Sequence, residues 1–381
     1  MKGMIFVPEI IENFYGDNLY TFTNTTCSCK EDIIYEAPYA EPHRTFKIFP
    51  EDNIVRFAYK AKKGLVRLNP NGTTKQENIL GTFIGLSTAP QKKIEQFLSE
   101  NGFILPLVPG EYNPIDVDAL IAIVNRLKTT VDLMSAIGSN KKDYAVIINH
   151  ALNLTLAPSI SIRVANYNYS SCTHLLSQLL SRADQISIRR DNAIQEKAGG
   201  EYFFIKDSLT DELYKYPIYD YNEIMYNHDM ACGDDLLWAI TKLFVNYNGS
   251  PAERSMIDLI FHFLHDSENE LVYDDKIKAA TMSFAQFTIG EEINHHLTGI
   301  HPEYNAETME PTWKVDSLMS ALYFSLFYLR PKMELYRPCG NPKCNNYFLV
   351  KSTSSKTKYC CNRCGNNMTQ ARYRQKKLSN K

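Results

Sequence analysis

The residues of this chain best suited to chemistry are five cysteines near its C-terminus. Cys339 and Cys344 are separated by four residues, and fifteen residues separate Cys344 from the group Cys360, Cys361 and Cys364. Paired cysteines are typical of structural zinc sites, because each pair lets one turn or helix end direct two thiolates at the same ion. A four-sulfur ligand set favours Zn²⁺, a borderline-soft ion that accepts tetrahedral coordination. The sequence therefore predicts one structural Zn²⁺, bound by Cys339, Cys344, Cys364 and either Cys360 or Cys361.

Short local elements are expected to position these cysteines. Residues 340–343 form a turn sequence suited to a zinc knuckle, and the apolar run 347–350 predicts a strand. A polar turn at 352–357 would lead into a returning strand at 358–359. Cys360 and Cys364 lie one helical turn apart, so a helix that begins here and continues through 369–377 would place both sulfurs on one face. The zinc ion would fix this helix, whose hydrophobic support is too small to fold alone.

Basic residues are concentrated in the same region. From Arg330 to the C-terminus the chain has 13 of its 41 Lys and Arg residues and only one of its 43 acids, Glu334. This asymmetry indicates a polyanion-binding tail on an acidic body, because clustered Lys and Arg neutralise phosphates and release counterions. The alternative is a solvated basic face that docks on the protein's own acidic body or on a partner subunit. We expect nucleic acid, DNA rather than RNA, to bind through Lys356, Lys358, Arg363, Arg372, Arg374, Lys376 and Lys377.

The same residues resemble a known family. Residues 337–344, Tyr347-Phe348, 358–360, 364–367 and the Arg-rich end are similar to the CGNR zinc finger, a C-terminal module of bacterial proteins described as stress-linked transcription regulators. The resemblance implies Cys339, Cys344, Cys360 and Cys364 as ligands of the zinc ion, Tyr359 at an aromatic position, and a mostly helical region upstream. The chain departs from the family in two places. Three residues instead of four separate the second pair, and Asn367 stands where the family has Arg.

The chain upstream of the finger is expected to be mainly α in an α+β fold. Residues 1–88 lack helical periodicity and contain short β-branched and aromatic runs, so we expect a β-rich N-terminal subdomain there. Residues 89–330 are expected to form a helical body, and residues 331–381 the zinc finger. Helical spacing of apolar residues predicts helices from residue 90 to Gly102 and at 116–137, 145–156, 173–180, 234–245, 252–264, 276–288 and 315–329.

Other features of the sequence give weaker evidence about localisation and function. Nine cysteines and the lack of an early secretory or membrane-spanning stretch predict a soluble cytoplasmic protein with reduced thiols, and a homodimer is compatible with the sequence. The second hypothesis is an effector enzyme, nuclease-like and acting in stress or phage defence, that its finger targets to nucleic acid. The His and Asp residues at 228–229 and 262–266 could serve it as weak metal-site candidates, although a plain helical face explains them better. Glu292 and His295 likewise fit a solvated helix face better than a di-iron motif.

Overall fold

The computed structural model of the chain forms two compact units. The first contains residues 1–140, 159–172 and 292–381, and the second contains residues 141–158 and 173–291. The residues that the structure describes are 20–34, 43–60, 63–76, 78–108, 113–155, 157–174, 202–206, 213–217, 275–306, 309–330, 334–351, 353–354 and 357–379. The zinc-finger region lies entirely in the first unit.

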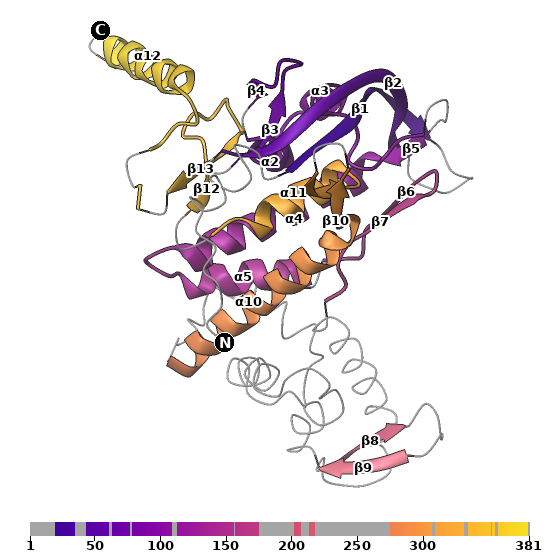
Figure 1. The fold of residues 1–381 in the computed structure, drawn as a ribbon. Helices are drawn as coiled ribbons and strands as arrows, with labels where there is room; N and C mark the ends of the chain where they lie inside the picture. Colours follow the sequence, from indigo (N-terminus) through magenta and orange to yellow (C-terminus); the bar gives the residue numbers. More distant parts are fainter. Residues whose placement is uncertain are drawn as a thin grey trace. The chain divides into compact units, whose positions relative to one another are not determined.

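A five-stranded antiparallel sheet forms the frame of the first unit (Figure 1). Its strands follow the order β1-β2-β3-β4, and β5 pairs with the part of β2 that β3 leaves free. Phe22 of β1 stacks on Phe57 of β2 with ring centroids 4.9 Å apart, which fixes the register of the two longest strands. The strands are β1 (Tyr20–Ile34), β2 (His43–Lys60), β3 (Gly64–Leu68), β4 (Thr74–Gln76) and β5 (Asn113–Asp116).

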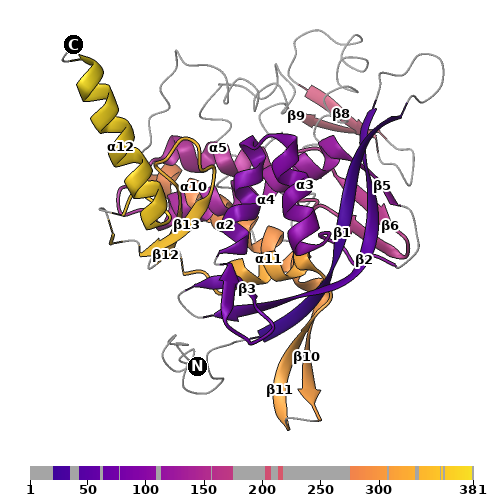
Figure 2. The same ribbon diagram turned by 90° about the horizontal axis from the view of Figure 1, so that it is seen from above.

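Helices cover one face of this sheet (Figure 2). Among them α3 packs on β1, α4 packs on β2 and β5, and α2 and α11 pack on β3. Three of these helices have a local start or stop signal: Asp116 caps α4, Ser317 caps α11, and Gly102 ends α3 at a φ of 80°. The elements are α2 (Ile79–Ile84), η1 (Gly85–Thr88), α3 (Gln91–Asn101), α4 (Val117–Gly138) and α11 (Leu318–Phe327).

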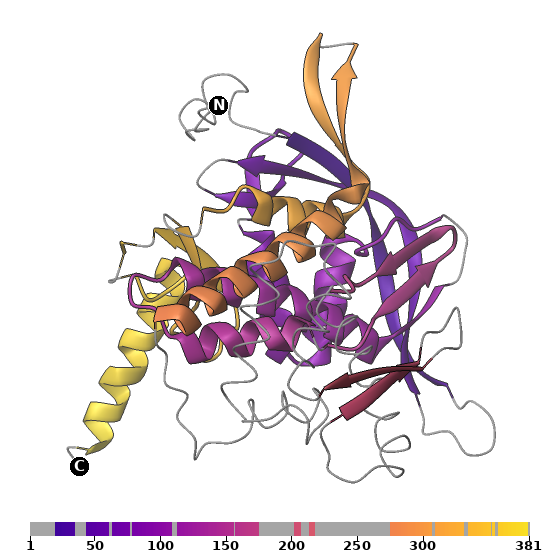
Figure 3. The ribbon, with the colours of Figure 1, turned by 90° about the horizontal axis from the view of Figure 1, so that it is seen from below.

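Three two-stranded ribbons complete the first unit. The strands β6 (Ser161–Val164) and β7 (Tyr167–Ser170) form one hairpin. After the short η6 (Leu297–Gly299), β10 (Ile300–Asn305) and β11 (Glu310–Val315) form a second ribbon, which projects beyond the sheet as the orange ribbon of Figure 3. The third ribbon, β12 (Glu334–Pro338) with β13 (Tyr347–Lys351), precedes the C-terminal helix α12 (Asn362–Ser379).

The second unit contributes α5 (Tyr144–Thr155), the hairpin of β8 (Tyr202–Lys206) with β9 (Leu213–Pro217), and most of α10 (Asp275–His296). Ile147, Ile148, Ala151 and Leu152 form the buried face of α5. The final turn of α10, from residue 292 onward, belongs to the first unit. No helix in the described parts of the chain is both long and apolar enough to cross a membrane.

The expectation of a mainly α protein is wrong. The described residues contain thirteen strands in five sheets, and the largest sheet is the surface on which the helices pack. Two of the β-branched and aromatic runs that predicted a β-rich N-terminal part, residues 45–49 and 54–59, are parts of one strand, β2, and its partner β1 carries few apolar residues. Strand pairing over long distances leaves only weak local patterns, which is why the helical signals dominated the interpretation. The three-part division at residues 88 and 330 stays a prediction.

Most helix predictions within the described residues are confirmed. The expected helices from residue 90 and at 116–137 and 145–156 correspond to α3, α4 and α5. The helix expected at 276–288 extends further, to His296, whereas the one expected at 315–329 starts later because residues 310–315 pair with β10 instead. Of the helix expected at 173–180 only residues 173–174 are described, and they have no regular structure. The helices expected at 234–245 and 252–264 and the His and Asp residues at 228–229 and 262–266 lie outside the described residues.

Candidate metal centre and nucleic-acid interface

The zinc knuckle is built on the hairpin of β12 and β13. The register pairs Leu335 with Val350 and Arg337 with Phe348, and Leu335, Phe348 and Val350 form a small buried cluster beneath Cys339 and Cys360. The strand expected at 347–350 is therefore confirmed, but its partner is β12 and not the expected strand at 358–359, where the chain has no regular structure.

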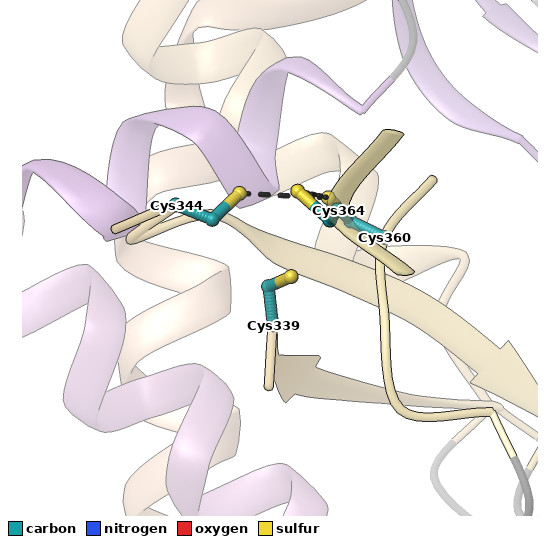
Figure 4. Close-up of side chains that lie close together, drawn as sticks. All are labelled: Cys339, Cys344, Cys360 and Cys364. Carbon is teal, nitrogen blue, oxygen red and sulfur yellow. Dashed lines mark hydrogen bonds between the residues drawn. The ribbon is translucent and has the colours of Figure 1, made fainter. Parts of the chain in front are cut away.

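Four cysteine sulfurs converge at the tip of this hairpin (Figure 4). The Sγ atoms of Cys339, Cys344, Cys360 and Cys364 all lie within 4.8 Å of one another. The Sγ of Cys360 is 3.5 Å from that of Cys344 and 3.7 Å from that of Cys364. A tetrahedral zinc site with bonds of about 2.3 Å separates its sulfurs by about 3.8 Å. The four cysteines thus fit one Zn²⁺ in both donor chemistry and spacing.

The fifth cysteine lies beside this group. The Cys361 side chain is exposed, whereas Cys360 is half-buried and Cys364 is buried. The Cys361 sulfur is 3.9 Å from that of Cys360 and does not belong to the group in which all four sulfurs approach one another. The geometry therefore brings together the ligand set that the family resemblance implies.

Backbone hydrogen bonds shape the first half of the site. The Cys344 N–H donates to the Asn341 carbonyl at 2.9 Å, and the Lys343 N–H donates to the Asn341 side chain at 3.1 Å. The Gly340 N–H donates to the Lys358 carbonyl at 2.7 Å, which joins the knuckle to the segment that carries Cys360. The two bonds to Asn341 form the tight turn that the sequence of residues 340–343 predicts.

The pKa values of Cys339, Cys360 and Cys364 are shifted by burial and by their neighbours. Burial raises the pKa of Cys364 to about 11, and burial together with the neighbouring Cys344 and Cys339 thiols raises the pKa of Cys360 above its usual range. Burial also opposes ionisation of Cys339, but hydrogen bonds from the Cys360 and Asn341 backbone outweigh it and lower the pKa of Cys339. Without a cation the four groups cannot all ionise cheaply, so a divalent ion would supply the charge that holds them as thiolates.

Tyr359 connects the knuckle to α12. Its ring lies against Gly340 and Gly365, where an added Cβ atom would approach the ring to 3.4 and 3.5 Å respectively. The Tyr359 hydroxyl accepts a hydrogen bond from Arg372 at 3.0 Å. Cys364 lies in the first turn of α12, so the helix is held at its start both by the metal centre and by this aromatic ring.

The basic residues predicted to bind nucleic acid lie mostly on α12. Every residue from 369 to 377 is exposed, so no side of the helix is covered in this part. The helix extends away from the sheet and helices of the first unit in Figures 1 and 2. Lys358 is exposed in the loop before Cys360, and Lys356 lies outside the described residues. The exposed basic residues of the helix are Arg363, Arg372, Arg374, Lys376 and Lys377.

The finger packs closely on α2, η1 and α4. The Asn78 side chain donates to the Tyr347 carbonyl at 2.7 Å, and the Asn345 side chain donates to the Thr88 carbonyl at 3.2 Å. A Cβ atom added at Gly81 would lie 2.1 Å from the Tyr347 carbonyl oxygen, and one at Gly85 would lie 2.3 Å from that of Asn345. These two glycines therefore permit an approach of backbones that no other residue allows.

The family comparison agrees with this geometry. Residues 336–377 match the CGNR zinc finger. No curated protein and no solved structure matches the chain. The CGNR match begins within β12 and ends within α12, so it includes all four sulfur ligands, Tyr359 and most of the basic helix. It covers a small part of the chain and concerns the finger alone.

A buried polar cluster in the body was missed from the sequence. Glu292, expected on a solvated face, is fully buried and forms an ion pair with the equally buried Arg126 of α4. Arg126 also donates from Nη2 to the Cys172 carbonyl at 2.7 Å, while its Nη1 has no hydrogen-bond partner among the described residues. The local sequence around Glu292 and His296 does not indicate that Glu292 is buried. Its ion-pair partner, Arg126, lies 166 residues earlier in the chain.

His296 completes this cluster. Its ring stacks on Tyr323 with centroids 3.8 Å apart, and its Nε2 is 3.1 Å from the Tyr169 hydroxyl. Burial lowers the pKa of His296 to about 4, although the Glu292 carboxylate opposes the shift. The ring is therefore neutral near pH 7, with Nδ1 donating to the Glu292 carbonyl at 2.8 Å and Nε2 accepting from Tyr169.

Proposed function

We propose that this protein binds nucleic acid through α12 and acts as a DNA-binding transcription regulator, whose body senses a ligand or mediates assembly. The observation that carries the proposal is a basic helix that is exposed on every side over residues 369–377 and held at its start by the four-cysteine centre. DNA is favoured over RNA because a rigid, protruding helix fits the major groove of B-form DNA, whereas the corresponding groove of an RNA duplex is too narrow.

The charge and exposure of α12 support this proposal over docking on the protein's own body. A helix that is polar all round gains little from tertiary packing and needs another partner to be useful. Arg372, Arg374 and Lys377 are exposed, and each phosphate neutralised by such a group releases a condensed counterion. The first turn of α12 lies in the metal centre, so the ion would set the direction in which these charges are presented.

The packing of the finger on α2 and η1 connects the position of α12 to the body. The hydrogen bonds of Asn78 and Asn345 and the contacts at Gly81 and Gly85 fix the knuckle relative to the sheet. A change in the body would therefore change the orientation of α12. This connection is what a ligand-sensing regulator requires, and a flexible tether would not provide it.

The effector-enzyme hypothesis has less support. Perturbed, clustered polar groups often mark active sites, and the cluster of Arg126, Glu292 and His296 is such a group. Each of these side chains is less than a tenth exposed, so a polymeric substrate could not contact them. A buried ion pair with a neutral histidine is consistent with a structural role in the core.

The decisive experiment measures binding of the zinc-loaded full-length chain to labelled duplex DNA and to RNA at several salt concentrations. The test variant is Arg372→Ala/Arg374→Ala/Lys377→Ala. We expect affinity for DNA that falls with salt, and a salt slope about 3 units shallower in the variant, since each lost phosphate contact removes about one unit.

A matched control removes three exposed positive charges from the body, as Arg56→Ala/Lys75→Ala/Lys92→Ala. This variant has the same net charge as the first and should bind like the wild type. Failure to bind either nucleic acid at low salt, or equal losses in both variants, would contradict the role of α12. Stronger binding to RNA than to DNA would contradict the choice of DNA.

A further inference from the structure

The exposed cysteine beside the metal centre is not needed to bind zinc. Cys361 lies outside the four-sulfur group, so the ligand set for one zinc ion is complete without it. Its side chain is exposed, and the two residues that follow it, Asn362 and Arg363, are exposed as well. A small oxidant dissolved in water can therefore reach this thiol without any movement of the chain. Solvent access is typical of cysteines that sense oxidants, and so is a second cysteine nearby.

A second cysteine does lie close to Cys361. The Cys361 Sγ is 3.9 Å from that of Cys360, and the Cys360 Sγ is 3.7 Å from that of Cys364. The three sulfurs form one continuous cluster in which Cys361 is exposed, Cys360 is half-buried and Cys364 is buried. A sulfenic acid formed on an exposed cysteine condenses with a neighbouring thiol to give a disulfide. The cluster therefore supplies both the cysteine that an oxidant reaches first and a cysteine that can react with it afterwards.

The backbone favours Cys364 as the disulfide partner. Disulfide-bonded residues usually have their Cα atoms about 4.4–6.8 Å apart. Consecutive residues such as Cys360 and Cys361 are only about 3.8 Å apart, which is too close for an unstrained bond. Cys361 and Cys364 lie across the first turn of α12, which the Gly365 N–H closes by donating to the Cys361 carbonyl at 3.2 Å. Helical geometry places their Cα atoms about 5 Å apart, so this pair fits a disulfide.

The sequence of this turn is also that of a redox motif. Residues 361–364 read Cys-Asn-Arg-Cys, a Cys-X-X-Cys segment at the start of a helix. In thiol–disulfide proteins the two cysteines of such a segment form and break a disulfide. In this chain the second cysteine of the segment, Cys364, is at the same time one of the four zinc ligands. A disulfide at this position would therefore remove a ligand from the ion.

We propose that Cys361 is an oxidation site through which hydrogen peroxide releases the zinc ion. The Cys361 sulfur attacks one oxygen of the peroxide, the O–O bond breaks and water leaves, which yields a sulfenic acid. The Cys364 thiolate then attacks the sulfenic sulfur, forms the S–S bond and expels hydroxide. The two sulfurs together lose two electrons, and the peroxide is reduced to one water and one hydroxide.

Loss of Cys364 opens the metal centre at the end that holds α12. Three sulfurs remain, those of Cys339, Cys344 and Cys360, whereas a structural zinc site has four ligands. None of these three residues lies within α12, so the helix itself no longer binds the ion. Zinc release does not depend on nucleic-acid binding. A loss of DNA affinity on oxidation does, and this part of the inference rests on the function proposed above.

Zinc release from the loaded full-length protein in hydrogen peroxide tests the proposal, with a chromophoric zinc indicator as the readout. The test variant is Cys361→Ser, which retains all four ligands. The matched control is Cys29→Ser, which removes a partly exposed thiol of β1 outside the finger. The control should release zinc at the wild-type rate. Cys361→Ser should release it at least about tenfold more slowly, because the ligand thiols are half-buried or buried.

Peptide mapping identifies the bond that forms. Trypsin cleaves after Arg363, so a Cys361–Cys364 disulfide joins peptides 359–363 and 364–372, whereas a Cys360–Cys361 disulfide stays within the first peptide. The joined peptides should increase in step with the zinc released and should be absent from Cys361→Ser. Reduction with a dithiol should separate them and restore zinc binding.

Two results would overturn the proposal. One is an equal rate of zinc release from the wild type and Cys361→Ser, and the other is zinc release without the joined peptides. The DNA affinity of the oxidised protein, measured in the same samples, separates this inference from the proposed function. Zinc release through the Cys361–Cys364 disulfide with unchanged DNA affinity would support the oxidation site and contradict the role of the zinc-held helix in binding DNA.

Discussion

Gly85 provides a test of whether the finger is docked as the structure has it. A Cβ atom at this position would lie 2.3 Å from the Asn345 carbonyl oxygen and 3.3 Å from the Cα of Asn346. Real Cβ contacts stay above 3.0 Å, so Gly85→Ala would force the knuckle to move by about 0.7 Å or more. Every atom in close contact belongs to the finger backbone, which cannot give way as a side chain would.

The expected cost is about 2 kcal/mol. Overpacking at a well-packed contact costs roughly 1–3 kcal/mol, and the hydrogen bond from Asn345 to Thr88, which is exposed, adds little. In the opposite direction, replacing glycine by alanine restricts the conformations of the unfolded chain. Where the side chain fits without strain, this stabilises the folded protein by roughly 0.5–1 kcal/mol. If the finger unfolds without zinc, the clash exists only in the zinc-bound state. The same 2 kcal/mol then appears as zinc affinity weakened about thirtyfold.

Competition with a chromophoric chelator measures this affinity, and urea unfolding with and without zinc measures stability. We expect Gly85→Ala to destabilise the zinc-bound protein and to leave the zinc-free protein unchanged or slightly more stable. The matched control is Gly290→Ala in α10, where nothing lies within 4 Å of the added Cβ. It should stabilise by about 1 kcal/mol without changing zinc affinity. Wild-type zinc affinity in Gly85→Ala would refute the docked arrangement.

Three further predictions concern the metal site and the buried cluster. Cys361→Ser should retain one zinc ion per chain, as measured by elemental analysis. Cys360→Ser should lose the ion or bind it at least about a hundredfold more weakly. The opposite result would make Cys361 the ligand. Glu292→Gln should lower the free energy of unfolding by about 3–5 kcal/mol, because it leaves the Arg126 guanidinium buried without a counter-charge. Arg126→Met/Glu292→Met should recover most of this loss in the same urea experiments, and a larger loss in the double variant would argue against the ion pair as its source. His296 has a pKa of about 4 when folded against an ordinary value of 6.5, so the unfolded chain binds its proton first and stability falls as the pH drops from about 6.5 toward 4. The contribution between pH 7 and pH 4.5 is about 2–3 kcal/mol, and a His296→Gln variant with the same pH dependence as the wild type would contradict it.

The metal site could be predicted from the sequence because its determinants are local. Cys339 and Cys344 lie on one turn, and Cys364 follows at a helical spacing from Cys360, so the ligand pattern survives without knowledge of the rest of the fold. The choice between Cys360 and Cys361 was not local. It depends on the path of the segment that the Gly340–Lys358 hydrogen bond attaches to the knuckle.

The sheet and the buried cluster could not be predicted because their determinants lie far apart in the sequence. The partner of Glu292 is Arg126, which lies in a different helix and gives no sign of its burial in the surrounding pattern. β5 is four residues long and pairs with β2, more than 60 positions earlier in the chain, through a contact that no local propensity encodes. Charged residues in a helical pattern usually face solvent, and this general tendency led to the wrong assignment of Glu292.

The interleaving of the two ends of the chain has a consequence for its synthesis. The Tyr20 hydroxyl donates to the Ala321 carbonyl, 301 residues later, and Tyr20 packs on Phe324. At ribosomal rates of about 5–20 residues per second, the first strand waits roughly 15–60 s for α11 to emerge. During this time α3 and α4 can already pack on β1 and β2, but the part of the sheet around Tyr20 that α11 covers stays open to chaperones or to aggregation. Contacts between residues so far apart give a high contact order, so we expect slow folding. A chain that ends before residue 318 would lack α11, the helix that packs on Tyr20.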